Sequence, residues 1–166
     1  MYTIWLMPDQ EAYLKLSTLI EDLSSIHQTP RFEPHVTLLS GITDDVDVAK
    51  DKLHLLARQM YPISVSLTHI DFLEYYYRCL FFNTSKSPSL FRARQKAEEL
   101  FEHLQITPFV PHISFLYGSI PTFKKEAIIE ELGDDFWLEF TMKNLRLVST
   151  QRTPENWSLI EEINLQ

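Results

Sequence analysis

Pro34-His35-Val36-Thr37-Leu38-Leu39, in the first half of the chain, returns in altered form as Pro111-His112-Ile113-Ser114-Phe115-Leu116 in the second half. Both copies read proline, histidine, apolar residue, hydroxyl residue, apolar residue, leucine. Because alternate side chains of a β-strand share a face, the histidine and the hydroxyl of each copy point the same way and the apolar residues face a core. The repeat therefore predicts two strands that present two imidazoles and two hydroxyls in matched settings, as a paired acid–base site for an oxyanion.

The elements expected around the two copies predict an α+β protein. Apolar residues recur at helical spacing in some segments and alternate in others. We expect strands near 2–7, 34–39, 63–70, 75–82, 111–116, 136–150 and 157–165, and helices near 8–26, 44–60, 87–104 and from 121. His112 follows His35 by 77 positions, about half of the 166 residues, as an internal duplication predicts.

These elements are expected to form one domain over residues 1–166. Each half reads as a helix, a loop, a histidine strand, a helix and a hairpin. We expect two pseudo-symmetric lobes, each an antiparallel sheet with helices outside, and the histidine strands would face each other across a central cleft.

The composition limits the classes of ligand. Hydrophobic residues make up 45% of the chain, which is enough for a sizeable core, and only 3 glycines are present, with no GxGxxG or Walker sequence. The net charge of -8 argues against long nucleic acid, whose affinity rests on many phosphate contacts. A small anion in a local pocket remains possible, and seven arginines are available to line one: Arg31, Arg58, Arg78, Arg92, Arg94, Arg146 and Arg152.

The single cysteine and the hydropathy pattern predict the cellular setting. Cys79 has no partner for an intramolecular disulfide, which fits a reducing compartment. No apolar run is long enough to span a membrane, and the first residues read as a strand that ends at Pro8 rather than as a signal peptide. We expect a soluble, cytoplasmic monomer without a membrane partner.

The repeated residue types suit the hydrolysis of a phosphodiester. A base must take a proton from water, an acid must protonate the leaving oxygen, and donors must hold the phosphate oxygens. Histidine serves the first two roles near neutral pH, and a general acid or base contributes about 10²–10⁴-fold. Thr37 and Ser114 can each donate a hydrogen bond to the phosphate. No HExxH motif or Cys/His cluster occurs, so we expect neither a metal nor another cofactor.

His35-Val36-Thr37-Leu38 and His112-Ile113-Ser114-Phe115 resemble the signature of the 2H phosphoesterase superfamily, two H-x-[ST]-[apolar] motifs in two pseudo-symmetric lobes. Within it, the chain looks most like the small cyclic phosphodiesterases of plants and fungi. That resemblance implies a metal-independent enzyme. It would open ADP-ribose 1″,2″-cyclic phosphate to the 1″-phosphate and nucleoside 2′,3′-cyclic phosphates to 2′-phosphates.

The same resemblance implies roles for individual residues. His112 would act as the base for water and His35 as the acid for the departing oxygen, although the residues alone leave the reverse assignment open. Trp5 resembles a family tryptophan that would stack on a base or cover the ribose. Tyr117, five residues after His112, resembles a family tyrosine at the pocket and would donate to a phosphate oxygen.

Two further functions fit the same residues. Other branches of the superfamily resemble RNA 2′-5′ ligases or 2′-5′ oligonucleotide phosphodiesterases, so the site could accept a short RNA end. A steep loss of affinity with salt would indicate the several phosphate contacts that such a partner makes. A non-catalytic module that captures a nucleotide is the third possibility, and the absence of product would distinguish it.

Overall fold

The computed structural model describes residues 1–102, 108–133 and 136–166. Its strands are β1 (Tyr2–Pro8), β2 (Val36–Ile42), β3 (Ile63–Asp71), β4 (Leu80–Thr84), β5 (His112–Leu116), β6 (Glu139–Ser149) and β7 (Ser158–Asn164). Its α-helices are α1 (Gln10–His27), α2 (Val46–Ala57), α3 (Pro88–Phe101) and α4 (Thr122–Leu132), and two short 3₁₀ helices are η1 (Tyr76–Arg78) and η3 (Pro154–Asn156).

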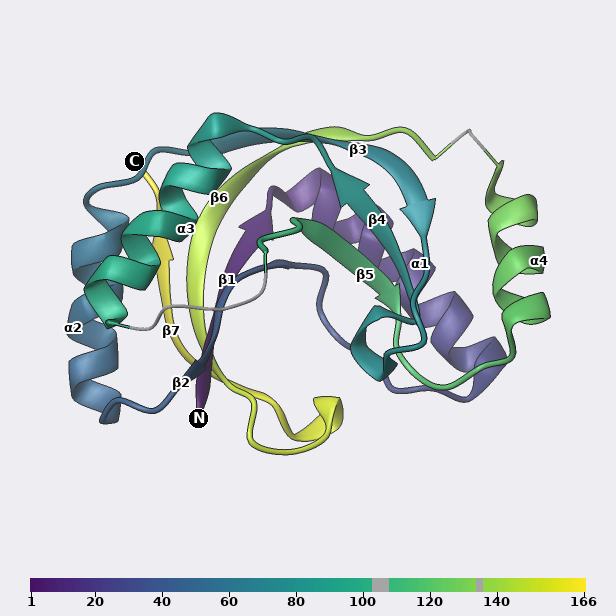
Figure 1. The fold of residues 1–166 in the computed structure, drawn as a ribbon, viewed down its shortest axis with the longest axis horizontal. Coiled ribbons are helices and arrows are strands. Elements are labelled where there is room, and N and C mark those ends of the chain that lie inside the picture. The colour runs from purple at the N-terminus through teal and green to yellow at the C-terminus, as the bar shows by residue number, and fades with distance from the viewer. Residues whose placement is uncertain (103–107, 134–135) are drawn as a thin grey trace.

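The strands form one curled antiparallel sheet with the helices on its outside (Figure 1). The strand order is β2-β1-β6-β3-β4-β5, and β7 pairs with β6. Every pair of neighbouring strands is antiparallel. The prediction of an α+β fold with an antiparallel sheet and outer helices is confirmed.

This strand order is a palindrome of two β-α-β-α-β units. Unit 1 runs from β1 to β3 and unit 2 from β4 to β6. If each strand is replaced by its counterpart in the other unit, the result is the same strand order read from the opposite edge of the sheet. The third strand of each unit pairs with the first strand of the other, so that β6 lies beside β1 and β3 beside β4. We call this arrangement the strand exchange.

The expectation of two pseudo-symmetric lobes did not specify which strands each lobe contains, and the strand exchange answers this. Residues 63–66 of β3 pair with residues 139–142 of β6, which joins the two lobes into a single sheet. Each lobe therefore contains strands from both halves. The exchanged strands satisfy backbone groups that would otherwise form an open sheet edge on each unit.

Two helices also pack against strands of the other unit. Helix α1 of unit 1 packs against β5 of unit 2, and α3 of unit 2 packs against β2 of unit 1. Helix α1 begins where the Asp9 side chain accepts a hydrogen bond from the Ala12 amide, and it buries Ala12, Leu16 and Ile20 at a spacing of four. Helix α3 begins at Pro88, a favourable first position. Both helices were predicted, although the expected end of α3, at Leu104, lies outside the described residues.

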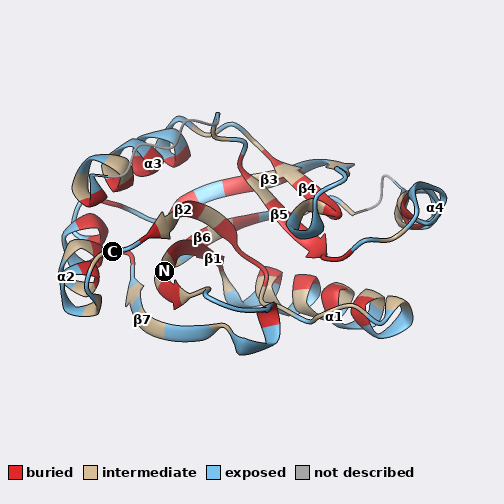
Figure 2. Cartoon of the chain, turned by 60° about the horizontal axis from the view of Figure 1, so that its bottom comes forward, coloured by how far each residue is buried: buried red, intermediate tan, exposed pale blue. Residues whose placement is uncertain are grey.

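A buried arginine holds α3 to the first histidine strand. Arg94 is 6% exposed, and its Nη1 donates a hydrogen bond of 2.5 Å to the carbonyl oxygen of Leu38 on β2. Its charge is paired with Glu98 at 2.7 Å. The apolar positions of both motifs lie in the core, as predicted, and the buried residues follow the inner faces of helices and strands (Figure 2). These motif residues are Val36, Leu38, Ile113 and Phe115.

The segment between β3 and β4 differs from the expected strand at 75–82. Residues Tyr76–Arg78 form η1, and β4 begins only at Leu80. The Leu73 amide donates to the Arg78 carbonyl, and the Arg78 amide donates to the Tyr75 carbonyl, which closes a compact turn. This turn places the side chains of Tyr77 and Arg78 at the pocket inside the curled sheet. A continuous strand would have placed them differently.

Within the described ranges, no helix is long and apolar enough to cross a membrane. The single domain, the monomeric state and the cytoplasmic location stay predictions.

Candidate active site

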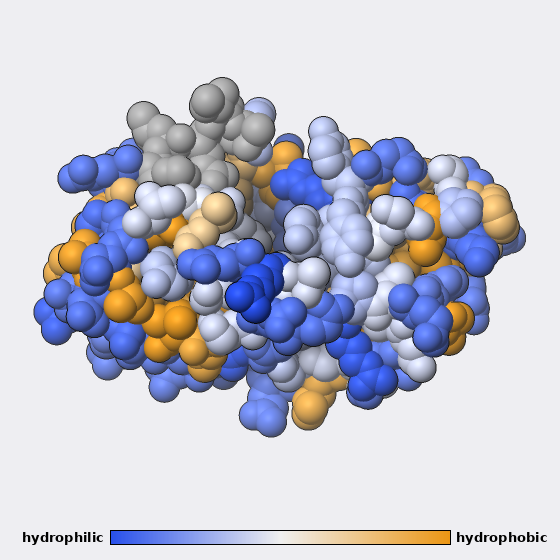
Figure 3. Space-filling view, turned by 90° about the horizontal axis from the view of Figure 1, so that it is seen from below, coloured by the Kyte–Doolittle hydropathy of each residue, from blue (hydrophilic) through white to orange (hydrophobic). Residues whose placement is uncertain are grey.

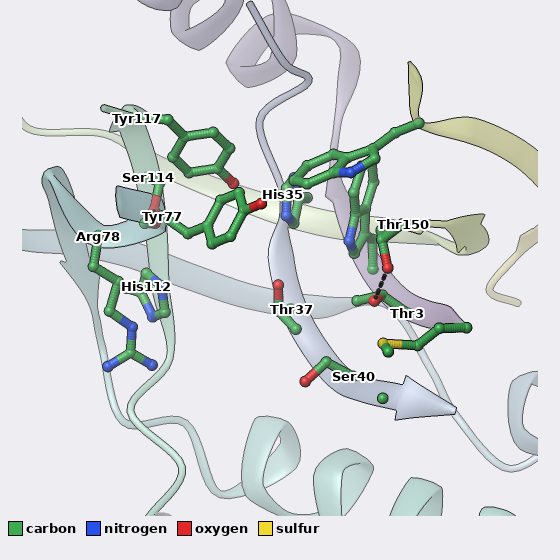
Figure 4. A pocket seen from close by; sticks show the side chains of 14 residues that line it. Thr3, His35, Thr37, Ser40, Tyr77, Arg78, His112, Ser114, Tyr117 and Thr150 are labelled. Carbon is green, nitrogen blue, oxygen red and sulfur yellow. Dashed lines mark hydrogen bonds between the residues drawn. The ribbon is translucent and has the colours of Figure 1, made fainter. Parts of the chain in front are cut away.

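The two motif histidines meet in one pocket of ≈ 390 Å³. His35 directly precedes β2 and His112 begins β5, so the two lobes each supply one imidazole. Figure 4 shows the labelled side chains in two groups that face each other across the pocket. All six residues predicted from the sequence line it: Trp5, His35, Thr37, His112, Ser114 and Tyr117.

Each imidazole is held in the same way by its own chain. The Nδ1 of His35 lies 2.6 Å from the carbonyl oxygen of Glu33, and the Nδ1 of His112 lies 2.7 Å from that of Val110. In both motifs a proline separates the histidine from this carbonyl, and its fixed φ helps to set the approach. A carbonyl only accepts, so Nδ1 carries the hydrogen and Nε2 is the nitrogen left to exchange a proton with a ligand.

Burial lowers the pKa of both imidazoles. The pKa of His35 falls from 6.5 to about 4, chiefly because burial penalises its charged form; the bond to Glu33 opposes this shift and the charge of His112 adds to it. The pKa of His112 also falls to about 4, again mainly by burial, with a further lowering by the Arg78 charge. Both histidines are therefore neutral at pH 7 in this structure.

Trp5 packs against the ring face of His35. The two rings stack with centroids 3.8 Å apart and planes 10° from parallel, and Trp5 is 3% exposed. This contact follows from the register of the sheet, in which Trp5 of β1 pairs with Thr37 of β2. The tryptophan thus fixes the plane of the imidazole as well as lining the pocket.

The two motif hydroxyls are not equivalent. The Thr37 hydroxyl makes no hydrogen bond with any described residue, so it is available to a ligand. The Ser114 hydroxyl donates a 2.9 Å hydrogen bond to the carbonyl of Tyr77. Sequence symmetry predicted one role for both, whereas the structure gives Ser114 a second partner in η1.

Tyr117 lies buried beside Ser114. Its ring stacks on Phe32 with centroids 3.6 Å apart. Burial raises the pKa of Tyr117 well above its usual range, and a hydrogen bond with Ser114 only partly opposes the shift. The phenol therefore keeps its proton and remains a possible donor to a ligand.

Arg78 brings positive charge to the pocket beside His112 (Figure 4). It forms no ion pair with any described carboxylate, and burial lowers the pKa of its guanidinium. An unpaired, partly desolvated guanidinium is suited to an anion. Nothing in the sequence separates Arg78 from the other six arginines, because the turn at η1 is what brings it to the pocket. Among residues the structure describes, no three His, Cys, Asp or Glu side chains gather as metal ligands.

Other pocket residues were not singled out by the sequence either. Tyr77 comes from η1 and Trp157 from the end of η3. Thr3 and Thr150 also line the pocket, and their hydroxyls hydrogen bond to each other at 2.9 Å. Seen from below, the surface is hollowed near its middle, between side chains of mainly intermediate to hydrophilic character (Figure 3).

A charged network stands behind His35. The Glu33 carboxylate accepts hydrogen bonds from Arg146 Nη1 at 2.6 Å and from the Tyr13 hydroxyl at 2.7 Å. Arg146 also pairs with Glu162. Burial, together with the bond to Glu33, raises the pKa of Tyr13 to about 12, so this phenol stays a donor. The network anchors the residue whose carbonyl orients His35.

Solved structures of other proteins share this curled antiparallel sheet. The fold matches the protein TT0787 of Thermus thermophilus with a TM-score of 0.69 and 17% identity, over 99% of this chain and 97% of that one. It also matches Escherichia coli LigT, solved in complex with 3′-AMP, with a TM-score of 0.62 and 15% identity over 99% and 97%.

Residues 1–165 match the model of the family described as cyclic phosphodiesterase-like protein, and the chain belongs to that family. A cyclic phosphodiesterase of Arabidopsis thaliana is 26% identical over 99% of this chain and 94% of the plant protein. The resemblance predicted from the two motifs is thereby confirmed at the level of the family.

Proposed function

We propose that this protein hydrolyses cyclic phosphodiesters without a metal ion, opening nucleoside 2′,3′-cyclic phosphates, ADP-ribose 1″,2″-cyclic phosphate, or both. One observation carries the proposal. His35 and His112 are each oriented through Nδ1 by a backbone carbonyl, and both line the same pocket. Family membership supports the reaction class. The ligand is then a small nucleotide rather than a long nucleic acid.

In the proposed reaction, His112 Nε2 takes a proton from water as the water oxygen attacks phosphorus. The bond from phosphorus to one ring oxygen breaks, which is the 3′ oxygen of a nucleoside substrate or the 2″ oxygen of the ADP-ribose derivative. Protonated His35 gives its Nε2 proton to that oxygen. His112 is the more solvent-exposed of the pair, which favours it as the base for water. Proton exchange with solvent then restores the starting state.

The proposed reaction needs one imidazole to be charged, although the lowered pKa values make both neutral at pH 7 in the free protein. A cyclic phosphate carries a negative charge, and a nearby negative charge raises the pKa of a histidine. Binding of the substrate therefore favours uptake of a proton by one of the two imidazoles. A charge on His112 also lowers the pKa of His35, which disfavours the state in which both imidazoles are charged.

Three donors are placed to hold the phosphate oxygens as negative charge grows on them. The Thr37 hydroxyl is available without rearrangement, and the Arg78 guanidinium adds charge beside His112. Tyr117 offers a phenol that stays protonated. Ser114 would first have to turn its hydrogen away from the Tyr77 carbonyl.

Phosphorus NMR of the purified protein with adenosine 2′,3′-cyclic phosphate or ADP-ribose 1″,2″-cyclic phosphate, in EDTA, tests the proposal. We expect conversion to a monoester by the wild type, and loss of conversion in His35→Ala and in His112→Ala. The regiochemistry of the product identifies the leaving oxygen. Near-normal turnover in both variants, or turnover that disappears with EDTA, would contradict the mechanism. Turnover only of linear 2′-5′ oligonucleotides would assign another substrate class.

A further inference from the structure

Four large aromatic side chains line the pocket, and they fall into two kinds. Trp5 and Tyr117 are each 3% exposed, and each has a ring face covered, by His35 and by Phe32 respectively. Tyr77 is 49% exposed, and Trp157 is partly exposed. Only the second kind offers ring surface to a ligand.

Tyr77 and Trp157 come from opposite lobes and meet over the pocket. Tyr77 lies in η1, which leads into β4, and Trp157 follows η3, which leads into β7. Their ring centroids are 5.9 Å apart and their planes are tilted by 33°. We call these two rings the aromatic pair.

Both rings of the aromatic pair are held in place before any ligand binds. The indole Nε1 of Trp157 donates a 2.8 Å hydrogen bond to the Arg152 carbonyl. The Tyr77 carbonyl accepts a hydrogen bond from the Ser114 hydroxyl, and the Tyr77 ring packs edge-to-face with Tyr76, with ring centroids 5.1 Å apart. A fixed surface of this kind loses little conformational entropy when a planar group covers it.

The aromatic pair also borders both histidine walls. The ring centroids of Trp157 and Trp5 are 5.5 Å apart in an edge-to-face arrangement, and Trp5 is stacked on His35. The ring of Tyr77 lies 5.3 Å from Tyr117 and belongs to the residue next to Arg78. If the phosphate of a ligand lies between the imidazoles, a group joined to that phosphate through one sugar can therefore reach the aromatic pair.

We propose that the aromatic pair is a subsite for the nucleobase attached to the same ribose that carries the cyclic phosphate. This inference rests on the proposed function and narrows it to nucleoside 2′,3′-cyclic phosphates. In the ADP-ribose derivative, the adenine is separated from the cyclic phosphate by a diphosphate and a second ribose. Bases stack on aromatic side chains with little regard to sequence, so any of the four bases is accepted.

The spacing of the rings fixes how the base lies. Two stacking contacts of about 3.5 Å each would need about 7 Å between rings, and the aromatic pair is closer than that. The base therefore covers the exposed surface of the pair and is not inserted between its members. Loss of either ring removes part of one continuous platform.

Calorimetric binding of adenosine 2′-phosphate, compared with base-free 1-O-methylribose 2-phosphate, tests the subsite. We expect the wild type to bind the nucleotide at least about tenfold more tightly, and Tyr77→Ala and Trp157→Ala each to lose about tenfold for the nucleotide alone. Tyr77→Phe should retain the preference, because the ring and not the hydroxyl carries it. Equal affinity for the two ligands in the wild type, or an unchanged preference in both alanine variants, would overturn the inference.

Matched control residues lie outside the pocket. Tyr75 is 71% exposed in the same segment as Tyr77, and Trp137 is 66% exposed, and neither lines the pocket. Tyr75→Ala and Trp137→Ala should bind the nucleotide like the wild type. If they lose as much affinity as the variants of the aromatic pair, the subsite is not at the pair.

Turnover separates this inference from the proposed function. If the protein hydrolyses none of adenosine 2′,3′-cyclic phosphate, ADP-ribose 1″,2″-cyclic phosphate and glycerol 1,2-cyclic phosphate, but Tyr77→Ala and Trp157→Ala still weaken nucleotide binding, the function fails and the subsite stands. If the adenosine and glycerol substrates are both hydrolysed and neither alanine variant changes the ratio of their kcat/KM values, the function stands and the subsite fails.

Discussion

At the scale of the residue, the chemistry depends on how each imidazole is surrounded. Two histidines with the same sequence context share the same backbone acceptor geometry, but they differ in their neighbours. His35 lies on Trp5 and close to the Glu33–Arg146 network, whereas His112 lies beside Arg78. Such differences allow two identical groups to serve as acid and base in one turnover.

The pH dependence of kcat/KM should reflect the low pKa of the free imidazoles. The competent form of the free enzyme carries one proton on the pair, and the pKa of each histidine is about 4 rather than 6.5. That form becomes scarcer as pH rises above about 5, so kcat/KM should fall from pH 5 to pH 7. The kcat optimum should lie at higher pH, because bound phosphate raises the pKa of the acid.

Stopped assays between pH 5 and pH 8 check this expectation, with circular dichroism at each pH as the control for folding. The control matters because the unfolded chain holds its histidine protons up to about pH 6.5, so stability itself falls as pH drops from 6.5 toward 4. A kcat/KM value that rises from pH 5 to pH 7 would contradict the assigned neutral pair.

The unequal hydroxyls lead to a second expectation. Thr37→Val removes a donor that is already free, so kcat should fall by about 10²-fold, within the range seen when an oxyanion donor is lost. Thr37→Ser keeps the hydroxyl and should retain most of the activity. Ser114→Ala should lower kcat less and should also weaken the hold on η1, which limited proteolysis can measure. A larger kcat loss in Ser114→Ala than in Thr37→Val would reverse the two roles.

Arg78 gives a third expectation, in which activity and titration change together. Arg78→Met should lower kcat/KM by about tenfold or more, because a charged donor to phosphate is lost. It should also raise the pKa of His112, whose charged form the guanidinium disfavours. Histidine NMR titration reads the pKa directly. An activity loss without any change in the His112 titration would place Arg78 away from the histidine.

At the scale of the element, the connection that leads into β2 is held by a strand from the other unit. Arg146 of β6 pairs with Glu33, whose carbonyl fixes His35. Arg146→Met should therefore lower kcat by about tenfold through misorientation of His35, and Arg146→Lys should recover part of it. The His35 titration should move while that of His112 stays. A fall in thermal stability with unchanged kcat would show that the pair is only structural.

The same scale shows what sequence patterns can and cannot predict. Amphipathic spacing and caps predicted α1 and α3, and the motif alternation predicted β2 and β5, because these signals are local. The turn at η1 depends on remote contacts: Lys125 of α4 donates to the Leu73 carbonyl and to Glu74. No local pattern encodes that contact, so Tyr77 and Arg78 could not be assigned to the pocket.

At the scale of the whole molecule, the strand exchange means that neither lobe is complete without both units. Residues 63–66 and 139–142 pair across the middle of the sheet. We expect the lobes to unfold together, in a single transition with the same midpoint by tryptophan fluorescence and far-UV circular dichroism. Hydrogen exchange of β2 and β5 should report the same free energy of opening. Separate midpoints for the two lobes would show that the shared strands do not couple them.

The palindrome also has a meaning for ancestry. Two copies of a single β-α-β-α-β unit, related by a two-fold axis, would build the same curled sheet with one histidine strand on each side. In such a symmetric ancestor the two imidazoles would have identical protein surroundings. The segments outside the repeat remove that equivalence: residues 72–79, which join the units, carry Tyr77 and Arg78, and the connection to β7 carries Thr150 and Trp157. A fusion of two equal units would have created places where the sequence could diverge, and the segments that depart from the symmetry contribute side chains to the pocket.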